Sequence, residues 1–173
     1  MTTNILNLLK SLVLTILIIS SNIAFAQSYN TSSKKSIKYF QKAGKEFLNE
    51  NYQQSLSLVD KALDNDDEFT DALLLKAEIC MELKDDTLAI SSYERLLEVD
   101  SMYYPQSAIS LSRLYAKSFH FEKALNLLKW YLSLKNQKDI IRELAVKQLS
   151  LTEKKKSLVE NPVDYKPINI GDV

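Results

Sequence analysis

Few residues of this sequence have the types and spacing that chemistry requires. His120 is the sole histidine and Cys80 the sole cysteine. The usual zinc site needs several His or Cys ligands, and a catalytic triad needs a nucleophile assembled beside its histidine. Ser118 is near His120 in sequence, but this segment is typical of a turn. We therefore interpret His120 as a turn residue and Cys80 as a small, buried apolar residue.

Three other groups of residues each have a ligand-binding and a structural interpretation. Asp64–Glu68 is acidic, as calcium loops are, but it lacks the glycine and the distal glutamate of an EF-hand, which favours a solvated loop. Lys154–Lys156 could contact anionic lipid or peptidoglycan, although so short a run is more typical of a solvated helix face. Tyr103–Tyr104 and Trp130–Tyr131 could stack on a ligand, yet helical spacing favours packing.

Composition removes several classes of function. The chain has 173 residues with only two glycines, which are too few for a phosphate-binding loop. It carries 22 basic and 22 acidic residues, and a nucleic-acid-binding protein usually has a basic excess. The sequence therefore predicts no cofactor, no bound metal, no nucleic-acid partner and no enzymatic activity.

The first 26 residues are typical of an export signal. They contain Lys10 and no acidic residue, an apolar stretch from Leu12 to Ile19, and a small-x-small sequence at Ala24–Ala26. An uncleaved membrane anchor is the alternative, although the apolar stretch is short for a membrane span. We predict a signal peptide over 1–26, a flexible mature N-terminus over 27–35, and an exported protein of the periplasm or outer membrane of a Gram-negative bacterium.

The next hundred residues repeat. The segments YQQSLSLVDKAL from Tyr52, DTLAISSYERLL from Asp86 and FEKALNLLKWYL from Phe121 begin 34 and 35 residues apart and have helical spacing. Each is preceded by a first helix, in which we align Gly44 with Ala77 and Ser112 at an offset of 33 in block one. Asn51, Asp85 and His120 are predicted at the turns, where Asn and Asp can cap a helix.

A period near 34 with two helices per unit resembles the tetratricopeptide repeat (TPR) over about residues 36–134. The resemblance implies an all-α solenoid of about three helical hairpins, in which small residues such as Gly44 and Ser55 let paired helices approach. It also implies a concave, partner-binding groove lined by the first helices. Its mixed charge departs from the basic carboxylate clamp of chaperone-binding relatives. The predicted groove residues are Lys45, Asn49, Leu74, Glu78, Met81, Ile109, Arg113 and Lys117.

Residues 138–160 predict one further amphipathic helix that caps the array, so that the repeat domain spans 36–160. We place its apolar residues on one side: Ile140, Ile141, Leu144, Ala145, Leu149, Thr152 and Leu158. Asn161-Pro162 ends this helix, and an extended tail over 161–173 follows, leading toward an absent downstream domain.

The leader, the repeats, the cap and the tail motif NPVDYKPINIGD together resemble the N-terminal region of Bacteroidetes OmpA-family envelope proteins. In that family a WD-type β-propeller and an OmpA-like peptidoglycan-binding domain follow, and some relatives belong to the type IX secretion and gliding apparatus. The resemblance implies that the chain is a fragment, a truncated product or a stand-alone paralogue. Peptidoglycan would be bound only through the absent domain, and membrane contacts would come only through the leader or associated outer-membrane proteins.

Two functional hypotheses follow from these patterns. In the first, the chain is a non-enzymatic scaffold that binds a protein or peptide partner in the cell envelope. In the second, it is a structural spacer that positions downstream propeller and peptidoglycan-binding domains and has no ligand of its own. An enzyme is a third hypothesis, with almost no residues to support it.

Overall fold

The computed structural model describes residues 29–135 and 138–162, and every regular element within those ranges is an α-helix. The predicted signal peptide and residues 163–173 of the predicted tail lie outside them. No helix in the described ranges combines the length and the apolar content needed to cross a membrane. The helices are α2 (Lys34–Leu48), α3 (Tyr52–Leu63), α4 (Thr70–Glu82), α5 (Asp86–Asp100), α6 (Ser107–Lys117), α7 (Phe121–Ser133) and α8 (Asp139–Glu160).

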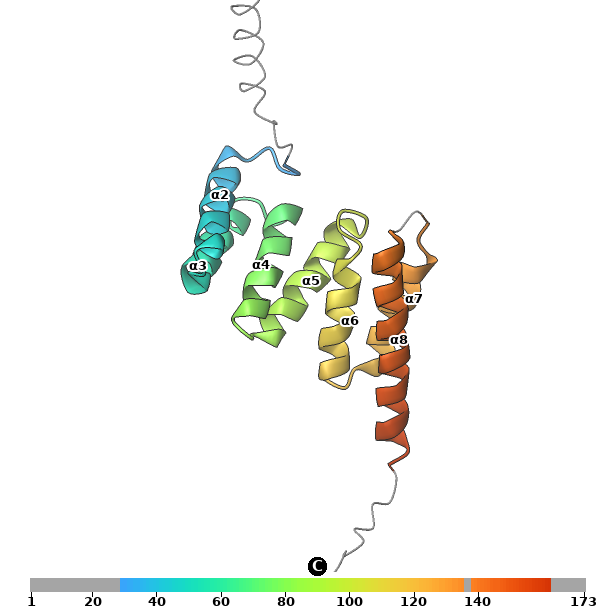
Figure 1. Ribbon diagram of the computed structural model, residues 1–173. Helices are drawn as coiled ribbons and strands as arrows, with labels where there is room; N and C mark the ends of the chain where they lie inside the picture. The colour runs from blue at the N-terminus through green and yellow to red at the C-terminus, as the bar shows by residue number, and fades with distance from the viewer. Residues whose placement is uncertain (1–28, 136–137, 163–173) are drawn as a thin grey trace, which may run out of the picture.

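The helices form a linear array of antiparallel pairs (Figure 1). Helix α2 packs on α3, α4 on α5, and α6 on α7, while α3–α4 and α5–α6 contacts join successive hairpins. Helix α8 closes the described array by packing on α7 and α6. The predicted solenoid of three hairpins and a capping helix is therefore confirmed.

Two small, fully buried residues lie at the centre of each hairpin. Because neither has a long side chain, the two helices approach closely and larger side chains fill the space around the contact. In the first hairpin the Ser55 hydroxyl donates a hydrogen bond to the carbonyl oxygen of Ala43 at 2.8 Å, so this buried polar group is satisfied. The three pairs, each with 0% exposure, are Ala43 and Ser55, Ala77 and Ala89, and Ser112 and Ala124.

The predicted role of Gly44 is wrong. A Cβ added at Gly44 would meet no atom within 4 Å, whereas Ala43 is completely buried. Ala43 is thus the equivalent of Ala77, and the first helices of blocks one and two are related by 34 residues rather than 33. A shift of one residue turns a helix by about 100°, so the correction changes which side chains of α2 share a face with those of α4.

The three hairpin turns share one backbone conformation. Glu50, Lys84 and Phe119 have positive φ angles of 61°, 59° and 62°. The next amide in each turn bonds back five residues, as in a Schellman motif: Asn51 to Glu46 (2.9 Å), Asp85 to Cys80 (2.9 Å) and His120 to Tyr115 (2.8 Å). Asn51, Asp85 and His120 precede the second helices, as predicted, but of these only Asp85 caps with its side chain, accepting from the Leu88 amide at 3.0 Å.

Cys80 lies inside the central core, as predicted. It is fully buried among Leu73, Tyr93 and Leu96, in the cluster that α4, α5 and α6 share. Burial raises the pKa of its thiol, because the thiolate is poorly solvated there. A buried, protonated thiol is a packing group rather than a nucleophile.

Residues of the predicted flexible N-terminus are held on the first two hairpins. The ring of Tyr29 contacts Phe40 and Phe69, with centroids 5.5 and 6.1 Å away. The amide of Asn30 donates to Asp71 Oδ2 at 3.2 Å, and the Thr31 hydroxyl donates to Asp66. The packed unit therefore includes residues 29–33, ahead of the predicted boundary at residue 36.

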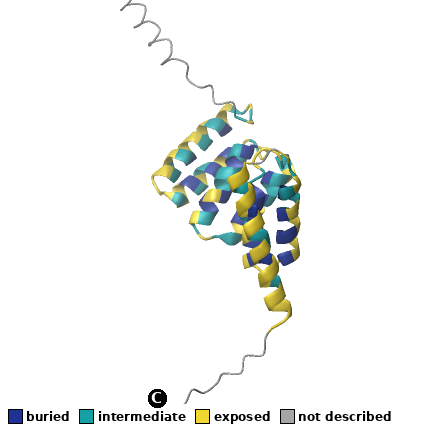
Figure 2. Ribbon diagram, turned by 45° about the vertical axis from the view of Figure 1, so that its right-hand side comes forward, coloured by how far each residue is buried: buried dark blue, intermediate teal, exposed yellow. Residues whose placement is uncertain are grey.

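Helix α8 has two apolar faces, and the prediction of a single one is wrong. Ala145 and Thr152 are fully buried, and Ile141 and Leu149 pack beside Ala145 against α6 and α7. The remaining residues of the predicted face point to solvent, namely Ile140 (67% exposed), Leu144 (53%) and Leu158 (55%). Exposed residues extend along most of this helix in Figure 2.

The position of the close helix contact is testable by paired substitutions in α2. Ala43→Leu should destabilise the fold by about 1–3 kcal/mol, because the added volume has no space. Gly44→Ala should stabilise it by about 0.5–1 kcal/mol, because it removes a helical glycine without a clash. Urea unfolding followed by circular dichroism measures both. The opposite order of stabilities would return the contact to Gly44.

The shared turn conformation makes a second prediction. Lys84→Gly should stabilise the protein by about 0.5–1 kcal/mol, because a left-handed residue with a Cβ is strained and glycine is not. Lys42→Gly, in the exposed middle of α2, is the matched control and should destabilise by about 1 kcal/mol. Thermal unfolding of both variants checks the pair. Equal destabilisation by the two glycines would contradict the strained turn.

Candidate functional site

The corrected alignment changes which residues of α2 are expected to line the predicted groove. At the corrected offset of 34 residues, four positions of α2 are equivalent to the predicted groove positions of α4. They are Phe40, Gly44, Phe47 and Leu48, which correspond in that order to Leu74, Glu78, Met81 and Glu82. A hollow of about 540 Å³ opens at these residues, lined by Tyr29, Phe40, Gln41, Gly44, Lys45, Phe47 and Leu48. Leu48 is 83% exposed. The sequence analysis did not predict this apolar pocket, because an offset of 33 residues between the first two blocks selects Lys45 and Asn49. An offset of 34 selects the residues that line the pocket.

Aromatic contacts hold the wall of this α2 pocket. Phe40 packs against Phe69 with ring centroids 5.1 Å apart, and Tyr29 contacts both rings edge-on. Gln41 Nε2 donates to the Tyr29 hydroxyl oxygen at 3.3 Å. Because edge-on and tilted contacts favour particular ring orientations, the pocket is shaped before anything enters it.

The predicted groove position on α4 has a fixed carboxylate. Glu78 is exposed on α4 between half-buried Leu74 and Met81. The hydroxyl of Tyr93, whose side chain is 1% exposed, donates to Glu78 Oε1 at 2.6 Å. Burial and then this carboxylate raise the pKa of Tyr93 above its usual value, so the phenol stays protonated at neutral pH. Glu78 thus offers its remaining lone pairs to a partner from a defined position.

The remaining predicted groove residues differ in exposure. Arg113 and Lys117 are exposed on α6, and Lys117 Nζ lies 2.5 Å from Asp86 Oδ2. Ile109 is 7% exposed and packs in the cluster shared with α7 and α8, so its side chain belongs to the core. Asn49 is the C-cap of α2, with its amide bonded to the Lys45 carbonyl oxygen. Lys45 itself is exposed and lines the α2 pocket.

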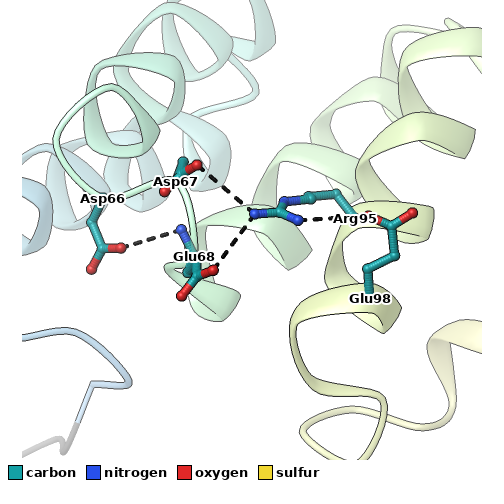
Figure 3. A network of polar contacts seen from close by, with 5 residues as sticks. All are labelled: Asp66, Asp67, Glu68, Arg95 and Glu98. Carbon is teal, nitrogen blue, oxygen red and sulfur yellow. Dashed lines mark hydrogen bonds and ion pairs between the residues drawn. The ribbon is translucent and has the colours of Figure 1, made fainter.

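The acidic segment between α3 and α4 faces a positively charged side chain of the protein, the Arg95 guanidinium (Figure 3). Arg95 Nη2 of α5 lies 3.8 Å from a carboxylate oxygen of both Asp67 and Glu68, and Arg95 Nη1 lies 3.6 Å from Glu98. Asp66 accepts the Glu68 amide at 3.2 Å. These exposed, long ion pairs each contribute little to stability, but they tie the loop to the second hairpin.

Residues 29–135 and 138–162 contain no group of three or more His, Cys, Asp or Glu side chains that could hold a metal ion. His120 lies at the third hairpin turn, as predicted, with its ring 6.1 Å from that of Tyr115.

The aromatic pairs behave differently from one another. Tyr131 is fully buried, and the Tyr103 hydroxyl donates to Asp71 Oδ1 at 2.6 Å, which joins the α5–α6 loop to α4. Trp130 is only half-buried and lines a second hollow of about 490 Å³ between α5, α6 and α7, beside Leu97, Leu111 and Leu127. The packing interpretation therefore holds for Tyr131 but only in part for Trp130.

Solved structures place this geometry in a known fold. No family model and no curated protein matches the sequence. The first TPR of Spaghetti (RPAP3), bound to the HSP90 peptide SRMEEVD, has 17% identity and a TM-score of 0.61, over 72% of this chain and 94% of that one. The fold is that of the tetratricopeptide repeat.

Two further TPR-like structures agree with this assignment. The Yersinia enterocolitica type III secretion chaperone SycD, in complex with a peptide of the translocator YopD, has 17% identity and a TM-score of 0.62, covering 72% of this chain and 97% of that one. The Sgt2 TPR domain of Aspergillus fumigatus has 14% identity and a TM-score of 0.62, covering 82% and 91%. At these identities the likeness establishes the TPR fold alone.

The Tyr93–Glu78 hydrogen bond is testable by removing one hydroxyl. Tyr93→Phe should lower the free energy of unfolding by about 1 kcal/mol, because a hydrogen bond to a charged acceptor is lost. Tyr39→Phe is the control, since no hydrogen bond of the Tyr39 hydroxyl is found in the described structure. Chemical denaturation compares the two. Equal effects would show that the bond contributes nothing to stability.

Proposed function

We propose that this chain is a non-enzymatic interaction scaffold that binds a peptide or an extended segment of a partner protein along α2, α4 and α6. The α2 pocket is the observation that carries the proposal. It is apolar, open and shaped by Phe40, Phe47 and Leu48, and Glu78 follows at the equivalent face of the next repeat. Solved TPR-like structures with bound HSP90 and YopD peptides support the same mode of use.

The charges along this face indicate what the partner carries. A large apolar side chain fits the α2 pocket, where Lys45 is at the rim. Glu78 accepts hydrogen bonds, so a basic or amide group suits the middle of the groove, and Arg113 offers donors to a carboxylate or carbonyl group beyond it. A segment of mixed charge with one apolar anchor matches these features.

The cellular setting is proposed from the sequence. The leader-like residues 1–26 and the tail motif favour an exported protein of the bacterial envelope, related to the N-terminal region of OmpA-family or secretion- and gliding-associated proteins. In the alternative function the repeats only space other domains, and the groove has no ligand.

A selection with random 12-residue peptides on the full-length chain tests the scaffold proposal. We expect enrichment of peptides with one large apolar residue and both charge signs. Leu48→Asp and Glu78→Lys should each weaken binding of the selected peptides at least about tenfold, because they place charge in the pocket and reverse charge in the groove. Fluorescence anisotropy measures the dissociation constants.

Lys61→Glu is the matched control, because Lys61 is exposed on α3, outside this face. It should leave peptide affinity unchanged. Leu48→Asp and Lys61→Glu should keep the wild-type melting temperature, whereas Glu78→Lys should lose about 1 kcal/mol of stability with the Tyr93 hydrogen bond and still fold. If no peptide is enriched, or if binding is equally insensitive to every variant, the spacer hypothesis replaces the scaffold.

A further inference from the structure

The second apolar face of α8 is a narrow stripe of large side chains. Ile140, Leu144, Leu151 and Leu158 are 67%, 53%, 46% and 55% exposed. At 100° per residue they fall within about 40° of arc, and they span about 27 Å of the helix. Leu144, Leu151 and Leu158 are seven residues apart, so they recur at one position of a heptad, and Lys147 and Lys154 stand three residues after Leu144 and Leu151.

This stripe is separate from the face that α8 uses in the fold. Ala145 and Thr152 are the fully buried residues of α8, and Lys156 of the same side bonds to Glu122 at the start of α7. That bond lowers the pKa of Glu122 and raises the pKa of Lys156. Since the stripe lies roughly a third of a turn away, the contacts of α8 with α6 and α7 leave it uncovered.

Basic residues border the stripe and form no ion pair within the described part of the chain. Lys147, Lys154 and Lys155 are exposed and lie three or four residues from Leu144, Leu151 or Leu158, which are neighbouring positions on a helix. None of the three forms an ion pair with any residue of 29–135 or 138–162. Among the residues three or four positions from the stripe, Glu143 is the acidic one. With the three lysines it gives the border two net positive charges, whereas the whole chain has a net charge of zero.

We propose that this stripe of α8 is a second docking surface that binds an acidic amphipathic helix of a partner protein. A helix with apolar residues at heptad spacing would fit the leucines, and its flanking Glu or Asp residues would pair with the three lysines. The chain would then hold two partners, a segment in the groove and a helix on its cap.

Two other occupants fit the stripe less well. A second copy of the chain would bring the like charges of Lys147, Lys154 and Lys155 toward one another, which opposes association. A membrane surface favours a broad apolar face, whereas the four residues of this stripe fall within about 40° of arc, and exposed Val146 and Val159 lie outside that arc on opposite sides.

Two synthetic 21-residue helical peptides test the proposal on the full-length chain. Both carry leucine at heptad positions, and the flanking positions are glutamate in one and lysine in the other. Anisotropy titrations at low salt should show binding of the glutamate peptide at least about tenfold tighter than binding of the lysine peptide. Added salt should weaken that preference, because exposed charge pairs are screened.

Variants of the chain locate the binding surface. Combined Lys147→Glu, Lys154→Glu and Lys155→Glu should reverse the peptide preference, and Leu151→Gln should weaken both peptides at least about tenfold. Circular dichroism should show unchanged melting, since the three lysines make no ion pair with the residues that the structure describes. Leu48→Asp, in the α2 pocket, should leave binding of both peptides unchanged, so failure of the groove proposal is distinguished from failure of this one.

Three outcomes would overturn the proposal. The first is no binding, or binding with no charge preference. The second is co-sedimentation with vesicles that contain roughly one-third phosphatidylglycerol, lost in the lysine variant, while neither peptide binds. The third is a concentration-dependent dimer in analytical ultracentrifugation that Leu151→Gln dissolves, which would assign the stripe to a second copy of the chain.

Discussion

The close approach of two helices at a pair of small residues is the constraint on which this structure depends. Ala77 and Ala89 show it most simply, because neither has a side chain that could hold α4 and α5 apart. Both are fully buried in one cluster with Tyr93 and Leu96, so the hairpin is one packed unit. Repetition of that unit, with successive hairpins in contact, turns short helices that would be marginal alone into a continuous core.

The fold was predictable from the sequence, because a period near 34 and small residues at fixed positions are local signals. Its exact alignment was not. Gly44 is the smallest residue of α2 and stands next to Ala43, and composition alone does not say which of the two faces α3. The packed N-terminal residues also escaped prediction, since Tyr29 is fixed by Phe69, forty residues away, and no periodic pattern reports such a contact.

The candidate site followed the alignment. Glu78 and Arg113 were found at exposed positions of α4 and α6, because their repeats were aligned correctly with each other. The α2 pocket was missed through a one-residue error, and Ile109 was assigned to the groove although α8 covers it. A helical wheel gives the direction of a side chain but does not identify the helix that packs against it. The burial of Ile109 beside α8 therefore followed only from the three-dimensional structure. The two faces of α8 were merged for the same reason.

The end of the solenoid depends on one contact of α8. Ala145 lies over Ile109, Leu128 and Tyr131, three apolar side chains that would otherwise meet water. Proteolytic loss of α8 would expose these side chains and leave the three hairpins in place. The product would keep most of its helix content but would be prone to aggregate through its exposed end. Loss of α8 would therefore lower the solubility of the protein before it changed the secondary-structure content.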